Sequence, residues 1–155
     1  MSEFLIKQIK FSEILPIWQT QLWPNRTSII EPVSAIKLDS TIDGEILNLI
    51  DSARFFAAFD SDKIIGVISG HLTAENQCRL RGLYVDKAYR GQSISKQLIQ
   101  TQLDYAKSIS CTQIWAMIRI SNFGLFQKFE FEKQLETNKY EYGPHYIVQR
   151  PIRLN

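Results

Sequence analysis

One stretch of the sequence, Leu80 to Ile99, constrains the fold of this chain more than any other. An apolar strand pattern ends at Val85, a short polar turn follows, and from Ile94 the apolar residues recur at helical spacing. The first turn of such a helix carries unpaired backbone N–H groups at the positive end of the helix dipole, which favours an anion. The stretch therefore predicts a site for a phosphate-bearing ligand, although a serine-capped helix without a ligand would show the same order.

The composition indicates one folded domain over residues 1–155. Hydrophobic residues make up 45% and charged residues 22% of the chain, a balance typical of a protein with a buried core. The formal net charge is +2 and the Lys and Arg residues are scattered, so nucleic acid is not expected as a partner. Cys78 and Cys111 are far apart and histidines are few, which indicates neither a disulfide framework nor a metal site.

The sequence also lacks long apolar segments. No run approaches the roughly 18 apolar residues that a membrane span needs, and the N-terminal MSEFLIKQIKF lacks the apolar core of a signal peptide. We therefore expect no membrane partner and a cytoplasmic location.

Alternating and helical patterns of apolar residues divide the chain into expected strands and helices. The expected strands are Phe4–Ile9, Arg54–Phe59, Lys63–Leu72, Cys78–Val85, Gln113–Ile120 and Tyr146–Ile152. The expected helices are Glu13–Leu22 with Ser12 as N-cap, Glu45–Ile50 within the loop region 26–51, Ile94–Ile109 and Phe123–Phe129. Short turns predict an antiparallel start, and a strand, helix and strand in succession imply a parallel pair with a right-handed crossover. The fold class is therefore α/β, with one mixed sheet flanked by helices.

The loop at the start of the Ile94 helix holds the residues that could contact a phosphate: Arg90, Gly91, Gln92, Ser93, Ile94, Ser95 and Lys96. A loop of short side chains lets backbone amides approach phosphate oxygens, while hydroxyl and cationic side chains add donors and charge. The loop is not a Walker loop, because no Gly-Lys-Ser/Thr follows, and it lacks the GxGxxG of a dinucleotide fold.

Several segments together resemble the general N-acetyltransferase (GNAT) superfamily. LYVDKAYRGQSISKQLI is similar to its cofactor-binding segment, in which Arg/Gln-x-x-Gly-x-Gly/Ala follows a valine strand end. LRG, RISNFGLFQKFEF and GPHYIV resemble, in the same order, segments of a set of small bacterial-type acetyltransferases. The resemblance covers nearly the full chain and implies a GNAT-like fold, acetyl-CoA as cofactor, and transfer of its acetyl group to an amine.

The resemblance also implies where the cofactor would bind. Leu83 and Val85 would meet the pantetheine, Val85 through its backbone where the strand parts from its neighbour. The loop from Arg90 to Lys96 would wrap the pyrophosphate, and Phe126 would lie near the sulfur. Attack of an amine on a thioester needs a deprotonated amine, N–H donors for the oxyanion, and a proton for the leaving thiolate.

Three residues depart from the family pattern. Ser93 replaces a glycine, and its Cβ would cost on the order of 1 kcal/mol if the backbone there needs a positive φ. Phe126 stands where the family often has a tyrosine as general acid, and Glu130 stands where a glycine usually ends the short helix. Since a free thiol has a pKa of about 8.5, a thiolate can leave without that acid.

The remaining acid–base candidates are Tyr84, His145 and Tyr146. His145 could shuttle a proton near neutral pH, or its ring could fix the terminal loop through hydrogen bonds. The sequence does not decide between these roles.

Three residues are candidates for contact with the acceptor. Arg79 and Arg81 alternate with the apolar positions of their strand, so they could line a pocket for an acidic substrate or pair with carboxylates on a neighbouring strand. Trp23 could cover the acceptor groove or pack in the core. The residues that choose the acceptor are expected within Arg26–Ile50 and Glu136–His145, and the sequence does not identify that acceptor.

The leading hypothesis is an acetyl-CoA-dependent N-acyltransferase that acts on the primary amine of a small molecule by direct transfer. The alternative is a GNAT-fold acyl-CoA-binding or scaffold protein with weak or no catalysis. A third possibility is an acyltransferase for a protein N-terminus or lysine side chain. A homodimer is a further expectation from the resemblance.

Overall fold

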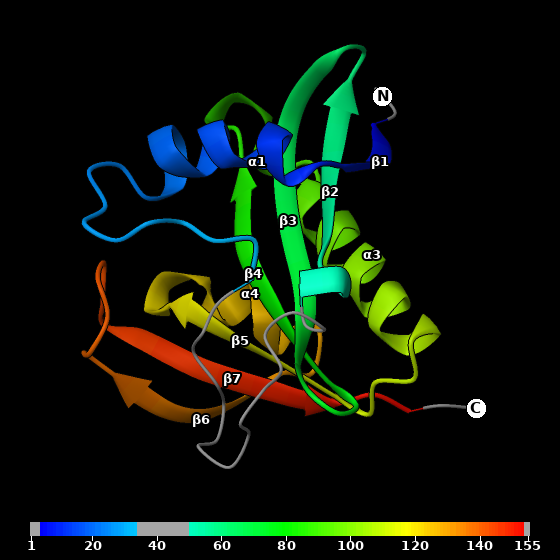
Figure 1. Ribbon diagram of the computed structural model, residues 1–155, viewed down its shortest axis with the longest axis vertical. Helices are drawn as coiled ribbons and strands as arrows, with labels where there is room; N and C mark the ends of the chain where they lie inside the picture. Colours follow the sequence, from blue (N-terminus) through cyan, green and yellow to red (C-terminus); the bar gives the residue numbers. More distant parts are fainter. Residues whose placement is uncertain (1–3, 34–49, 154–155) are drawn as a thin grey trace.

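A computed structural model describes residues 4–33 and 50–153, and within them seven strands form one mixed sheet in the order β1-β2-β3-β4-β5-β7-β6 (Figure 1). The strands are β1 (Leu5–Ile9), β2 (Arg54–Asp60), β3 (Lys63–Ala74), β4 (Gln77–Val85), β5 (Gln113–Arg119), β6 (Glu132–Thr137) and β7 (His145–Pro151). The helices are α1 (Phe11–Ile17), α3 (Ile94–Ser108) and α4 (Phe123–Gln127), with a π-helical turn η1 (Trp18–Leu22) and 3₁₀ turns η2 (Lys87–Tyr89) and η3 (Ile120–Asn122). The predicted α/β class and mixed sheet are confirmed. The helix predicted over Glu45–Ile50 falls, apart from Ile50, outside the described residues.

The three strands β2, β3 and β4 form an antiparallel meander, as the alternating sequence and the polar turns predict. β5 then joins β4 in parallel after the α3 crossover, which is also as predicted. This pairing extends only from Gln77 opposite Gln113 to Leu80 opposite Ala116. Beyond that point β4 and β5 run apart, as Figure 1 shows.

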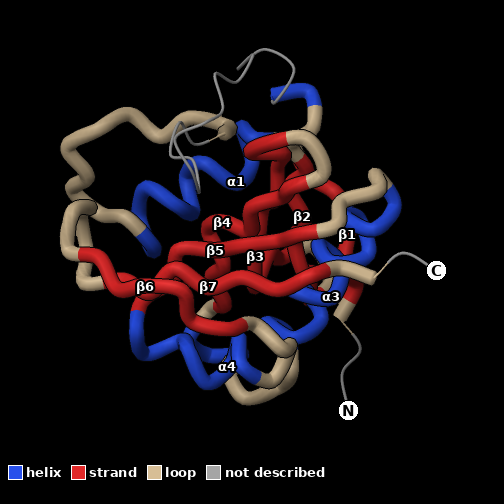
Figure 2. Tube along the Cα trace, turned by 90° about the horizontal axis from the view of Figure 1, so that it is seen from below, coloured by secondary structure: helices blue, strands red, loops and turns tan. Residues whose placement is uncertain are grey.

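Helices cover both faces of the sheet, with α1 on one side and α3 and α4 on the other (Figure 2). The core on the α1 side is built around Trp18, Phe55 and Val67. The core on the α3 side takes in the buried stripe of that helix: Ile94, Leu98, Ile99, Leu103 and Ala106. Each fully buried Leu or Ile in such a stripe contributes about 2 kcal/mol.

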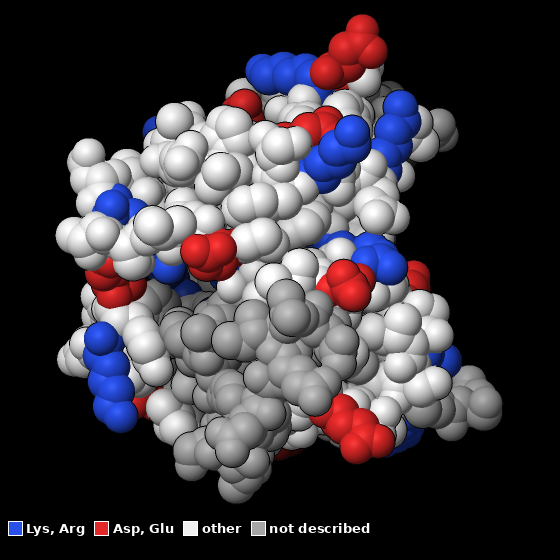
Figure 3. Space-filling model, viewed as in Figure 1, with Lys and Arg blue, Asp and Glu red and all other residues white. Residues whose placement is uncertain are grey.

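The described part of the face seen in Figure 3 carries no large patch of a single charge sign, because Lys and Arg lie among Asp and Glu there. This matches the scattered charges of the sequence. No helix in the described part of the chain is both long enough and apolar enough to cross a membrane.

The first helix begins earlier than predicted. Its N-cap residue is Lys10, whose backbone N–H donates to Oε1 of Glu13 at 3.0 Å. Ser12 lies inside the helix, so the prediction of Ser12 as N-cap is wrong: the capping group is a carboxylate three residues after the cap. After Pro16 the helix widens into η1, in which the N–H of Trp23 donates to the carbonyl of Trp18 at 2.7 Å.

β6 is a strand that the sequence analysis missed. It pairs with the last strand, β7, at the edge of the sheet, and five of its six residues are exposed. Because an edge strand that faces water on both sides carries no apolar alternation, the sequence EKQLET gives no strand signal. β7 itself lies where the last strand is predicted.

A bulge in β4 lies where this strand leaves β5. Tyr84 pairs with Val67 and Arg81 with Ser69, so Gly82 and Leu83 together face the single residue Ile68. Gly82 has a φ of +69°, and its carbonyl accepts a hydrogen bond of 2.9 Å from Nε1 of the fully buried Trp18. The bulge bends β4 and holds it against η1.

α3 begins directly after a residue in the left-handed region. Ser93 is the N-cap, with φ +64° and ψ +18°, and its side chain makes no capping hydrogen bond. A Cβ is strained in this conformation, which glycine adopts freely. The sequence analysis allowed for a positive φ at Ser93, because the resemblance implies a glycine there. The structure has this positive φ with serine as the residue.

We predict that Gly82→Ala lowers the free energy of unfolding by about 3 kcal/mol, because overpacking and a left-handed Cβ are both unfavourable. A Cβ at Gly82 would lie 2.3 Å from the Trp18 ring. Urea denaturation measures the change. The control is Gly124→Ala in α4, where a Cβ meets nothing within 4 Å, and which should be neutral or slightly stabilising. Equal effects of the two substitutions would contradict the role assigned to the bulge.

We predict that Ser93→Gly raises the free energy of unfolding by about 0.5–1 kcal/mol, because the left-handed strain of the N-cap is removed. The matched control is Ser95→Gly, two residues further on in the first turn of the same helix, which should destabilise the protein by a few tenths of a kcal/mol because glycine is a poorer helix former than serine. Opposite signs in urea denaturation support the assignment, and a loss of stability in both variants would refute it.

Candidate active site

The gap between β4 and β5 contains a pocket of about 70 Å³. Leu83 of β4, Met117 of β5 and Phe126 of α4 line it, together with His145 at the start of β7. The gap exists because the parallel pairing stops at Leu80 and Ala116. The pocket is therefore a direct product of the sheet topology.

The edge of β4 that faces the gap presents backbone groups. The N–H of Asp86 donates to Ile65 of β3 at 2.7 Å, and since the peptide is trans, the carbonyl of Val85 points the opposite way, toward the gap. In this structure Nε of Arg90 donates to that carbonyl at 3.1 Å. The predicted backbone contact through Val85 is geometrically available, because a carbonyl oxygen has two lone pairs.

The loop from Arg90 to Lys96 follows this edge and ends in the first turn of α3. The N–H of Gln97 bonds to Ser93, so the N–H groups of the three residues before it have no partner within the helix. Lys96 is exposed in that turn, and Gly91 is exposed with a φ of +83°. This loop and first turn, which we call the cradle, offer N–H donors and a positive charge to a phosphate group.

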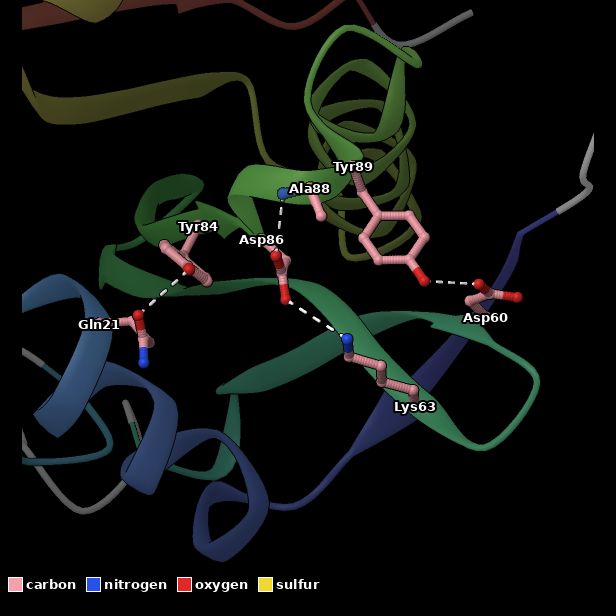
Figure 4. A network of polar contacts seen from close by, with 7 residues as sticks. All are labelled: Gln21, Asp60, Lys63, Tyr84, Asp86, Ala88 and Tyr89. Atoms are coloured by element: carbon pink, nitrogen blue, oxygen red, sulfur yellow. Dashed lines mark hydrogen bonds and ion pairs between the residues drawn. The ribbon is translucent and has the colours of Figure 1, made fainter.

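A polar network fixes the segment that leads into the cradle (Figure 4). Asp86 accepts from the N–H of Ala88 at 3.0 Å and lies 3.8 Å from the ammonium of Lys63. The hydroxyl of Tyr89 donates to Asp60 at 2.7 Å. The β2–β3 hairpin thus anchors η2, which precedes the cradle.

Phe126 closes the gap on the α4 side. It is 3% exposed and its ring meets that of Phe131 edge-on, with the centroids 5.3 Å apart. The position at which the resemblance to acetyltransferases implies a tyrosine is therefore an apolar wall. Glu130, where the same resemblance implies a glycine, has a φ of +67° and lies at the surface, 3.8 Å from Arg150.

A second pocket, of about 420 Å³, adjoins the first on the α1 side. The two pockets share the lining residues Trp23, Arg81, Gly82, Met117 and His145. The second pocket extends between the segment after η1 and the loop that joins β6 to β7, where Arg26, Ser28 and Lys139–Tyr142 complete its walls. These residues fall inside the two ranges that the sequence analysis reserved for acceptor selection.

Two hydrogen bonds tie the walls of this second pocket together. Oγ1 of Thr27 donates to Glu141 at 2.7 Å, and the hydroxyl of Tyr142 donates to the carbonyl of Pro24 at 2.5 Å. The bonds from Thr27 lower the pKa of Glu141, which keeps this carboxylate ionised. The β6–β7 loop is thus clasped to the segment after η1.

His145 lies where the two pockets meet. It is 8% exposed, and Nδ1 is buried without a hydrogen-bond partner among the described residues. Burial, and then the positive charges of Arg119 and Arg79, lower the pKa of His145. The imidazole is therefore neutral at pH 7 and can accept a proton.

The other two predicted acid–base residues lie elsewhere. Tyr84 donates its hydroxyl to Gln21 of η1 at 3.3 Å (Figure 4) and lines a separate pocket on the α1 side. Tyr146 faces away from its neighbour His145 because side chains alternate along a strand, and its ring packs edge-on against Phe123 at 5.3 Å. The structure does not bring either tyrosine to His145.

The three predicted acceptor residues all line the second pocket, and two of them have partners. Arg81 donates to the carbonyl of Glu31 at 2.7 Å and lies over the rings of Trp18 and Trp23. Trp23 also lies 5.1 Å from the guanidinium of Arg26. Arg79 pairs with no carboxylate among the described residues, so the predicted ion pair with a neighbouring strand is not found there.

Sequence reasoning missed Met117 and Asn122, which line the first pocket. Neither belongs to a residue class that signals chemistry, so only their positions after the strands separate could identify them. The hydrogen bond between Thr27 and Glu141 was also missed, because its partners are 114 positions apart in the sequence.

Comparisons with known proteins agree with this geometry. N-acetyltransferase 8B of Homo sapiens is 29% identical over 87 residues, which are 51% of this chain and 38% of that protein's length. The structure of Ard1 from Thermoplasma volcanium superposes with a TM-score of 0.72 at 15% identity, over 98% of this chain and 99% of that one. An N-acetyltransferase from Staphylococcus aureus Mu50 superposes with a TM-score of 0.69 at 22% identity, over 98% of this chain and 100% of that one.

The structural matches establish the fold, and the sequence match goes further. The profile of the acetyltransferase (GNAT) family matches residues 17–131, which contain η1, the bulge, the cradle and Phe126. This chain belongs to the acetyltransferase (GNAT) family.

Proposed function

We propose that this protein transfers an acetyl group from acetyl-CoA to the primary amine of a small molecule by direct attack. The observation that carries the proposal is the junction of the two pockets at the gap between β4 and β5. The first pocket is lined by Leu83 on the β4 edge that leads to the cradle, and the second extends to Arg26 and Lys139–Tyr142. Two reactants can therefore reach the gap from different directions.

The residues on the first side fit the parts of a CoA thioester. The first turn of α3 offers N–H groups and Lys96 to phosphate oxygens, the edge at Leu83 and Val85 offers backbone groups to amides, and Phe126 offers an apolar wall. When bound, acetyl-CoA supplies a thioester whose acyl carbon is electrophilic.

His145 is the proposed proton acceptor for the incoming amine. Its neutral ring lies at the junction, and Nδ1 has a free lone pair or N–H in a site shielded from water. Phe126 leaves no hydroxyl at the α4 wall, and a thiolate with a pKa of about 8.5 does not require one. The alternative of a non-catalytic acyl-CoA-binding protein is not favoured, because the relatives matched are acetyltransferases.

We expect saturable binding of acetyl-CoA in calorimetry, and release of free thiol when a panel of primary amines is added. Lys96→Ala should weaken acetyl-CoA binding by about 3-fold, the scale of an exposed charge contact. Lys107→Ala, at the other end of α3, should leave it unchanged. Absence of binding would refute the proposal, and binding without thiol release on any amine would leave only the non-catalytic alternative.

We also expect His145→Gln to lower kcat by about 100-fold or more, the usual contribution of a general base, with acetyl-CoA affinity unchanged. The amine must lose one proton, so log kcat/KM for the wild type rises with pH at unit slope. Below the lowered pKa of His145, the slope should steepen to two because His145 protonates as well. A steepened slope that persists in His145→Gln would show that another group is the base.

A further inference from the structure

Within the part of the chain that the structure describes, Arg79 is a buried cation without a counter-charge. Its side chain comes from the centre of β4 and is 5% exposed, with the guanidinium 4.9 Å from the ring centroid of Trp115. Nε and Nη1 are both buried and have no hydrogen-bond partner among residues 4–33 and 50–153. A buried charge that lacks a partner is strongly unfavourable, so such a group is expected to have a ligand.

The residues around Arg79 add further positive charge to this unpaired one. Arg81 and Arg26 add positive charge nearby, and burial followed by the charge of Arg81 lowers the pKa of Arg79 to about 9, which leaves it cationic at neutral pH. Arg81 is satisfied by the carbonyl of Glu31 and by its aromatic neighbours. Within residues 4–33 and 50–153, the acidic residue that lines the same pocket is Glu141, and Thr27 already binds it.

The exposed part of Arg79 lies in the second pocket, which His145 also lines. We propose that the amine acceptor also carries a carboxylate, and that this carboxylate pairs with Arg79 while the amine lies beside His145. This inference rests on the proposed function, because it assigns the second pocket to the acceptor.

The chemistry of the pocket favours one carboxylate on a compact molecule. Two nitrogens of one guanidinium lack a hydrogen-bond partner among the described residues, which matches one carboxylate, and a carboxylate is a strong charge-assisted acceptor for arginine. The pocket holds about 420 Å³, and its walls are clasped by Thr27 with Glu141 and by Tyr142 with Pro24. A volume of this size lies within the range typical of small-molecule sites, so it has room for a small molecule that carries both an amine and a carboxylate.

The first test measures binding without turnover. With CoA present in place of acetyl-CoA, thermal unfolding is followed with each standard amino acid, with β-alanine and 4-aminobutyrate, and with the carboxamide of each. At least one amino acid should raise Tm more than its carboxamide does, and the difference should vanish in Arg79→Met. If no carboxylate exceeds its carboxamide, or if the difference survives in Arg79→Met, the inference is overturned.

The second test uses the protein without any ligand. Because Arg79→Met removes an unpartnered buried charge at nearly constant volume, Tm should rise by about 3 °C or more. Arg153→Met removes an exposed charge beyond the opposite end of β7, and it should leave Tm nearly unchanged. A lower Tm for Arg79→Met would show that Arg79 already has a partner in solution, which would overturn the inference.

The third test separates this inference from the proposed function. With acetyl-CoA, kcat/KM for the amino acid identified by the Tm shift should exceed that for its carboxamide by about 30-fold, a typical scale for a buried charged hydrogen bond, and the ratio should approach one in Arg79→Met. Turnover of amines without any preference for a carboxylate overturns the inference and leaves the function intact. Carboxylate-dependent Tm shifts without turnover of any amine refute the function and leave the anion site intact.

Discussion

The indole of Trp18 rests on the backbone of Gly82, and its N–H bonds to the Gly82 carbonyl at 2.9 Å. No side chain fits between them, because a Cβ at Gly82 would lie 2.3 Å from the ring. This contact holds the bulge at which β4 turns away from β5. The gap, the open backbone edge of β4 and both pockets follow from it. Since Trp18 comes from η1, the widened turn after Pro16 is also part of the site's construction.

The bulge at Gly82 and Leu83 separates two parts of β4 that offer different groups to the site. Residues before it remain within the paired sheet, so the side chain of Arg79 is held in the protein interior. Residues after it have a free edge, which leads to η2 and the first turn of α3. One strand therefore presents a buried cation to the second pocket and backbone groups to the first. His145 stands between them, and the same burial that hides its Nδ1 keeps the ring neutral.

The sequence predicted most of the fold, because long runs of alternating or helical apolar residues report which face is buried. It failed at β6, whose exposed residues carry no such pattern, and at the start of α1, where Glu13 rather than Ser12 caps the helix. Among the candidate site residues, local motifs in the sequence indicated the loop of the cradle and the positions Ser93 and Phe126. The sequence could not separate His145 from Tyr84 and Tyr146, because residue type alone does not tell which side chain faces the gap.

The sequence by itself determined the order of strands and helices, the cradle before α3 and the absence of a hydroxyl at Phe126, because each of these is encoded within a few neighbouring residues. Only the tertiary structure decided which groups share a pocket. Arg79, Arg26, Tyr142 and His145 are separated by up to 119 residues in the chain and come together through the sheet order and the clasped loops. Whether Arg79 has a partner depends on these contacts, since the sequence shows an arginine on a strand and the fold shows what surrounds it.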